Sequence, residues 1–105
     1  MSVNPHRGEV AVVLDGRRHA ARLTLGALAS LEAALGAGSL VEVIERFEAG
    51  RFSSRDVMAV LVAGLRGGGW QGADPDLLTA EIEGGPVAAA RAAAELIARA
   101  FRLPE

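Results

Sequence analysis

Cysteine, lysine and tyrosine are absent from this sequence of 105 residues. Without cysteine, the chain can form no disulfide, thiol nucleophile or thiolate metal site. All 11 basic residues are arginines, and their longest run is Arg17-Arg18. Nucleic-acid binding relies on clustered basic side chains that neutralise phosphates, and the net charge here is −2. The composition therefore argues against a nucleic-acid partner.

Long hydrophobic runs are also missing. The longest one extends from Val57 to Leu65, which is about half of the roughly 20 residues that a bilayer-spanning helix needs. The first dozen residues lack the positive start and the apolar stretch of a signal peptide. We therefore expect a soluble, cytoplasmic protein without a membrane partner.

Aromatic residues are scarce, with one Trp and three Phe, yet half of the residues are hydrophobic. Alanine, leucine and valine must therefore form the core, and such a core leaves little room for a large internal cavity. The length suits one domain and is too short for two. We expect a flexible arm over residues 1–7 and a single domain over residues 8–105, with a hairpin at 8–23 and a helical part at 24–101.

The hairpin is predicted from Asp15-Gly16, which stands between two short extended runs. A two-residue type I′ turn needs positive φ at both central positions, and Asp-Gly is a strong signal for it. The turn pairs Leu14 with Arg17, Val12 with His19 and Val10 with Ala21. A lone hairpin is marginal in water, so its apolar face must pack on helices; that face carries Val10, Val12, Leu14, Ala21 and Leu23.

Three helices are predicted after the hairpin. Residues 25–35 follow Thr24 as N-cap and end at Gly36. A capping box, Ser39 to Glu42, opens the next helix, which ends at Gly50 and buries a face at helical spacing; that face comprises Leu40, Val43, Ile44 and Phe47. The third helix is capped by Ser53, with Asp56 in its first turn, and it ends at the glycines 67–69. It is apolar nearly all round, which is typical of a central element.

Two more helices complete the expected fold. Asp74-Pro75-Asp76 opens a short helix to about Glu83, because proline is tolerated in the first helical turn. The last helix covers residues 86–101 after Gly84-Gly85, and one of its sides carries Val87, Ala90, Ala94, Ile97 and Phe101. The predicted fold class is α+β and mostly α, with an N-terminal β-hairpin packed on a bundle of about five helices.

Residues that usually perform catalysis are nearly absent. The two histidines, His6 and His19, have no second histidine or carboxylate at ligand spacing. The serines are mostly explained as helix caps, and no nucleophile motif surrounds them. The chain is therefore expected not to be an enzyme, with no catalytic residue, metal ligand or cofactor.

The segment from Gly67 to Gly69 has the composition of a phosphate-binding loop but the wrong order. Such a loop follows a strand and opens a helix, whereas these glycines close one. The interpretation is a helix stop, which leaves Trp70 as either a core residue or a contact for a partner. Because Trp and Arg are enriched at binding hot spots, the predicted partner-binding residues are Arg66, Trp70 and Gln71.

An ordered set of short motifs resembles one known family. The motifs are Arg7-Gly8-Glu9-Val10, Leu14-Asp15-Gly16-Arg17, residues 23–28, Leu31-Glu32, Ala34-Leu35-Gly36, Arg55-Asp56-Val57, residues 63–69, Gly84-Gly85 and Ala100-Phe101. This set is similar to the small tail protein of alphaproteobacterial gene transfer agents, a prophage-derived group that resembles phage tail assembly chaperones. The resemblance covers roughly residues 7 to 101.

The resemblance implies a tail assembly chaperone that binds the tape measure protein during virion assembly. Such proteins keep the long, helical tape measure soluble until tube subunits polymerise around it. The alternative is a structural component of the tail, either a tube or a tail-associated subunit, which would self-associate as a homo-oligomer. A third interpretation is a small enzyme or nucleotide binder, which requires a pocket with convergent polar groups. We expect no small-molecule substrate.

Overall fold

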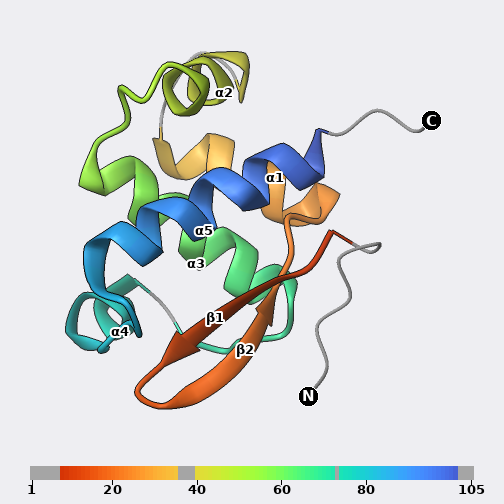
Figure 1. The fold of residues 1–105 in the computed structure, drawn as a ribbon. Coiled ribbons are helices and arrows are strands. Elements are labelled where there is room, and N and C mark those ends of the chain that lie inside the picture. The colour runs from red at the N-terminus through yellow and green to blue at the C-terminus, as the bar shows by residue number, and fades with distance from the viewer. Residues whose placement is uncertain (1–7, 36–39, 73, 102–105) are drawn as a thin grey trace.

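The computed structural model of the protein describes residues 8–35, 40–72 and 74–101. Two strands open the chain, β1 (Val10–Leu14) and β2 (Arg17–Ala21), and helices follow (Figure 1). The helices are α1 (Leu25–Leu35), α2 (Leu40–Glu48), α3 (Ser54–Gly67), the short α4 (Asp74–Thr79) and α5 (Gly85–Ala100). The prediction of an α+β fold with an N-terminal hairpin and mostly helical remainder is confirmed. The predicted arm, the stop at Gly36 and the cap at Ser39 lie outside the described residues.

The hairpin has the predicted register. Val10 pairs with Ala21, Val12 with His19 and Leu14 with Arg17. The turn residues Asp15 and Gly16 have φ values of 51° and 80°, as a type I′ turn requires. The predicted inner face is buried at every position, Val10, Val12, Leu14, Ala21 and Leu23.

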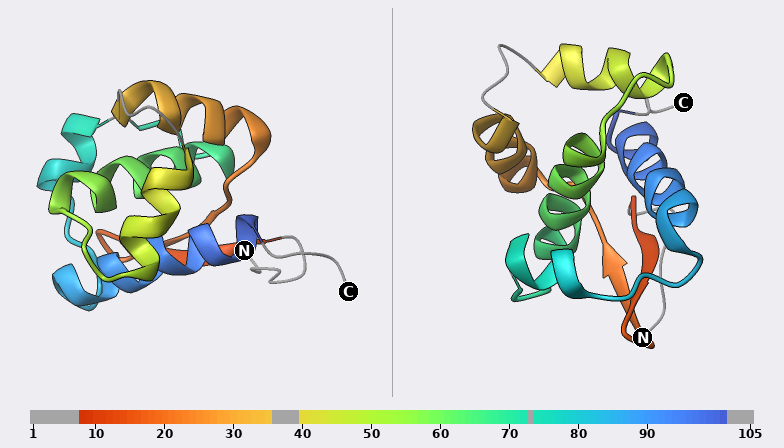
Figure 2. Two further views of the ribbon diagram at one scale, coloured as in Figure 1. Left: turned by 90° about the horizontal axis from the view of Figure 1, so that it is seen from above. Right: turned by 90° about the vertical axis from the view of Figure 1, so that its left-hand side faces the viewer.

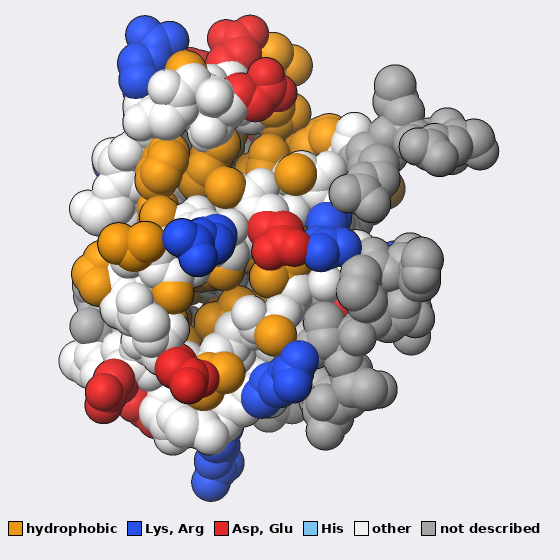
Figure 3. All heavy atoms as spheres, viewed as in Figure 1, with side chains coloured by type: hydrophobic (Ala, Val, Ile, Leu, Met, Phe, Trp, Pro, Cys, Tyr) orange, Lys and Arg blue, Asp and Glu red, His pale blue; other side chains and the backbone are white. Residues whose placement is uncertain are grey.

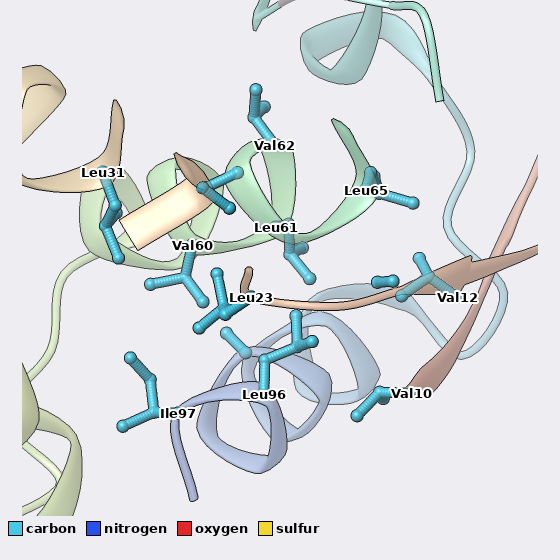
Figure 4. Close-up of a cluster of buried hydrophobic side chains, with 14 of the residues drawn as sticks. Val10, Val12, Leu23, Leu31, Val60, Leu61, Val62, Leu65, Leu96 and Ile97 are labelled. Atoms are coloured by element: carbon cyan, nitrogen blue, oxygen red, sulfur yellow. The ribbon is translucent and has the colours of Figure 1, made fainter. Parts of the chain in front are cut away.

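Helix α3 is the central element of the fold. It begins with the predicted cap at Ser53, which with Asp56 forms a capping box: Asp56 N–H donates to Ser53 Oγ at 3.1 Å and Ser53 N–H donates to Asp56 Oδ2 at 2.9 Å. It lies between α1 and α5 (Figure 2, right) and is buried from Val60 to Leu65. Its side chains meet those of β1 and α5 in one hydrophobic cluster (Figure 4). The apolar run that made α3 look central from the sequence therefore forms the core.

Glycines let α3 approach β2 at backbone distance. A Cβ built on Gly67 would lie 2.1 Å from the carbonyl oxygen of Arg22, and one on Gly68 would lie 1.8 Å from that of Ala20. Arg22 N–H also donates to the carbonyl oxygen of Gly64 at 2.7 Å. Gly67 ends α3 and Gly68 is its C-cap, so the prediction of a helix stop is confirmed. The same glycines also seat the end of α3 against the outer edge of β2.

The predicted end of the fourth helix was wrong. Helix α4 ends at Thr79 rather than near Glu83. The next residues turn toward the hairpin, where Ile82 forms a bridge with Leu14 and Glu83 N–H donates to the carbonyl oxygen of Val13 at 3.1 Å. These contacts cover the outer edge of β1 near the hairpin tip, which a continued helix could not do.

The side of the last helix that carries Val87, Ile97 and Phe101 is buried only in part. Ile97 is buried, but Val87 is 68% exposed and Phe101 is 39% exposed. The buried residues of α5 are instead Ala89, Ala93, Leu96 and Ile97. Alanines stand on both sides of this helix, so the composition alone does not fix which side faces the core. A Cβ built on Gly64 would lie 2.8 Å from Leu96 Cδ1, and this close packing selects the observed side.

Helix α2 is tied to the start of α3 by Arg46. Its guanidinium donates to Asp56 Oδ1 at 3.0 Å and to Glu42 Oε1 at 2.9 Å. The hydrogen bond with Glu42, followed by the attraction of Asp56, raises the pKa of Arg46 above its ordinary value. Val43 and Phe47 of α2 are buried as predicted, and Phe47 stacks on Phe52 with ring centroids 4.8 Å apart. Among the helices in the described ranges, none has the length and apolar run needed to cross a membrane.

Candidate interaction surfaces

A groove of about 440 Å³ runs between α1 and α3. Helix α1 begins at Leu25 because Thr24 Oγ1 accepts a hydrogen bond from Ala27 N–H at 3.1 Å, as an N-cap does. Most of the side chains that line the groove are small, and Arg66 is the charged one among the described lining residues. Those from α1 and its cap are Thr24, Gly26, Ala27, Ser30, Leu31 and Ala34; those from α3 are Ala59, Val62, Ala63, Arg66 and Gly67. Small walls of this kind allow another backbone to come close.

The outer face of α1 continues this groove onto the surface. Helix α1 carries one charged residue, Glu32, among its 11 residues. Leu25 is 85% exposed, and Ala29 and Ala33, at four-residue steps along the same face, are exposed as well. A helix that is apolar all round is normally buried on all sides. The face of α1 with Leu25, Ala29 and Ala33 is exposed in the described structure, whereas Ala27 and Leu31 are buried.

A second hollow, of about 640 Å³, lies between the hairpin tip and the segment before α4. Trp70 lines it and is half-buried, because part of its indole packs on the hydrophobic core. A Cβ built on Gly72 would lie 2.1 Å from Trp70 Cζ2, so the ring rests over Gly72. Gln71 and Asp15 are exposed at the same hollow, and His19, which also lines it, is half-buried.

The predicted contact residues thus belong to two separate hollows. Trp70 and Gln71 line the hollow beside the hairpin, whereas Arg66 lines the groove between α1 and α3. Trp70 N–H donates to the carbonyl oxygen of Leu65 at 2.9 Å, which holds the chain close to α3 as it leaves the helix. Helix α1 was not among the predicted contacts, although its near lack of charge was a signal in the sequence.

A third hollow, of about 320 Å³, has an almost entirely apolar lining. It lies between the start of α3 and the start of α5, and its walls include Phe52, Met58, Leu77 and Pro86. Figure 3 shows that hydrophobic side chains also gather on the surface between α2 and α5. Apolar surface is therefore exposed on more than one side of the helical part.

Side chains that could perform chemistry are dispersed. Within the described ranges, His, Asp and Glu residues form no group of three or more that could hold a metal ion. His19 lies in β2 opposite Val12, at the open hollow beside the hairpin. The described surfaces thus offer shape and apolar contact.

Comparison with known families assigns the chain. A family model described as phage tail tube protein, GTA-gp10, matches residues 7–103. The chain belongs to this family. The match confirms the resemblance to the gene transfer agent tail proteins that the sequence motifs indicated. No curated protein and no solved structure matches the chain.

Membership of the GTA-gp10 family places the chain among phage-type tail proteins. A tail is built from several kinds of protein that contact one another, so other tail proteins are the partners that the family implies. The family description names a tail tube protein, and it is equally consistent with a structural role and with a role in assembly.

Proposed function

We propose that this GTA-gp10 family protein is a tail assembly chaperone that works by binding protein rather than by catalysis. Its partner is the tape measure protein, which it covers in the cytoplasm until tube subunits polymerise. The observation that supports this proposal most is the small size of the β-sheet. A tube wall is built by sheets that continue from one subunit to the next, and the sheet formed by the described residues has two strands.

Part of each edge of the sheet lies against another segment of the same chain. On the β1 side, Asp15 N–H donates to the carbonyl oxygen of Glu81 at 2.8 Å, and Val13 accepts from Glu83. On the β2 side, the glycines at the end of α3 lie against the carbonyl groups of Ala20 and Arg22. Edge strands recruit further strands through unpaired backbone groups, and an added strand would meet Glu83 at Val13 and the end of α3 at Ala20. A subunit that adds its sheet to the next would have to displace them.

Exposed apolar helix faces are a second observation that supports the chaperone proposal. The face of α1 and the groove beside it offer apolar surface that a partner helix could cover, which is a common mode of peptide recognition. We include Arg66, Trp70 and Gln71 as partner contacts, with Arg66 at the groove and the other two beside the hairpin.

The experiment is to co-express the chain with the tape measure protein that is encoded in the same cluster of tail genes. Both the complex and finished particles are then purified. A chaperone is expected to bind the tape measure, to keep it soluble and to be absent from finished particles. Stoichiometric presence of the chain in particles would overturn the proposal.

The second candidate is a structural tail component, which the words of the family description favour. This candidate predicts rings of the purified chain. Light scattering distinguishes the two: a mass that stays at 10.8 kDa over a wide concentration range supports the chaperone, and a ring-sized mass supports the structural component.

A further inference from the structure

We propose that the groove between α1 and α3 binds one helix of a partner tail protein, and that Arg55 and Arg66 select a helix with carboxylates about three turns apart. The inference rests on the proposed function only in taking a tail protein as the partner. It specifies where that partner binds and which of its side chains are recognised.

The first step is the spacing of charge along α3. Arg55, Ala59, Val62 and Arg66 follow one another at steps of four, three and four residues, which places them on one face of the helix. Ala59, Val62 and Arg66 line the groove, so Arg55 extends the same wall beyond it. Since each residue advances the helix by about 1.5 Å, the two guanidinium-bearing positions are about 16 Å apart along the axis.

The second step is that both arginines are available. Each is exposed, and within the described part of the chain neither takes part in an ion pair. The nearby Arg46, in contrast, is held by Glu42 and Asp56. Glu32, the acidic residue of α1, is exposed but does not line the groove. The groove is therefore positive at its α3 wall, and it complements a negatively charged partner.

The third step is the shape of the partner. Gly26, Ser30 and Ala34 on one wall, and Ala59 and Ala63 on the other, leave room for a helix to lie close to both. The exposed apolar face of α1, with Leu25 and Ala29, would contact the flank of that helix. An occupant with a small or apolar face and acidic residues at i and i+11 fits both the shape and the charge, since 11 residues make about three turns.

The test uses an array of overlapping 20-residue peptides that covers the tail proteins of the same cluster. It is probed with the wild-type chain, with the double variant Arg55→Glu/Arg66→Glu and with the control Arg91→Glu, an exposed arginine on α5. We expect the bound peptides to carry carboxylates about 11 residues apart. We expect the double variant to bind them at least about tenfold more weakly at low salt, and the control to bind them within about twofold of wild type.

Two further variants separate the groove from the charge. Ser30→Trp fills the groove without changing charge and is expected to weaken binding, whereas Ala98→Trp, on an exposed part of α5, is expected to leave it unchanged. Changing the two carboxylates of a bound peptide to lysine should restore its binding to the double variant. Circular dichroism and melting temperature confirm that each variant is folded.

The outcomes separate this inference from the proposed function. Peptides bound equally by wild type and by the folded double variant overturn the groove assignment and leave the chaperone proposal intact. Failure of the wild-type chain to bind any peptide or the co-expressed tape measure overturns both. Concentration-dependent self-association that Arg66→Glu abolishes would assign the groove to a second copy of this chain and overturn the inference.

Discussion

Asp15 and Glu81 hold each other through two hydrogen bonds that join the hairpin tip to the segment between α4 and α5. Asp15 N–H donates to the carbonyl oxygen of Glu81 at 2.8 Å, and Glu81 N–H donates to Asp15 Oδ1 at 2.9 Å. A residue chosen for a tight turn thus also anchors a segment 66 residues away. Because an isolated two-stranded hairpin is marginal in water, this anchor helps to keep the hairpin on the helices.

The first prediction concerns this anchor. Asp15→Ala removes the acceptor for Glu81 N–H. It also places alanine at φ 51°, a left-handed conformation that alanine tolerates less well than aspartate does. We expect the free energy of unfolding to fall by about 1–2 kcal/mol. Asp15→Asn keeps an acceptor and tolerates this backbone conformation, so it should remain within about 0.5 kcal/mol of wild type. Urea denaturation followed by circular dichroism measures both, and equal losses in the two variants would contradict the anchor.

The second prediction concerns the buried carboxylate at the start of α3. Asp56→Ala removes the acceptor for Ser53 N–H and the partner of Arg46. We expect the lost cap alone to lower the free energy of unfolding by about 1–2 kcal/mol. Glu45→Ala, at an exposed position of α2, is the control and should change it by less than about 0.5 kcal/mol. The same loss for both variants would mean that the capping box contributes little.

Features set by a few neighbouring residues could be predicted from the sequence. Asp15-Gly16 fixed the register of the hairpin because a type I′ turn pairs the strands in one way. Ser53 and Asp56 marked the start of α3, and Thr24 marked that of α1, because an N-cap and the N–H groups that it satisfies lie within one helical turn. Each of these features is present in the structure.

Features set by distant residues could not be predicted. The strand-like pairing of Ile82 with Leu14 depends on where the hairpin folds back, and the residues between 79 and 83 do not encode that position. The buried side of α5 depends on how Leu96 meets Gly64, because alanines on both sides of the helix give no preference. The groove between α1 and α3 is likewise a product of packing, although the low charge of α1 could have pointed to it.

The third prediction tests the close approach of α3 to β2. Gly67→Ala would place a Cβ 2.1 Å from the carbonyl oxygen of Arg22, and backbone atoms cannot move aside as a flexible side chain can. We expect a loss of about 1–3 kcal/mol in the free energy of unfolding from this overpacking. Gly26→Ala is the matched control, because its Cβ would have no atom closer than 4.0 Å. In α1 this change should stabilise the protein by about 0.5–1 kcal/mol.

Thermal melts of these two glycine variants, recorded side by side, provide the measurement. A Gly67→Ala protein as stable as wild type would show that the end of α3 can move away from the strand. In that case the end of α3 would not hold the edge of β2 closed, and a tube subunit would be disfavoured only by the contacts on the β1 side.

The last prediction separates the two roles of Trp70. Its indole is half-buried on the core and rests over Gly72, while its remaining surface lines the hollow beside the hairpin. Because part of the ring is already in water, Trp70→Ala should cost about 1–3 kcal/mol, less than removal of a fully buried Trp, and the chain should stay folded. If Trp70 is also a partner contact, capture of the tape measure protein should fall by at least about tenfold, as at a binding hot spot.

Trp70→Phe, which restores much of the core packing, distinguishes the role of Trp70 in stability from its role in contact: stability should recover more than binding. An unfolded Trp70→Ala protein, or a folded one that captures its partner as well as wild type does, would assign the indole to the core alone.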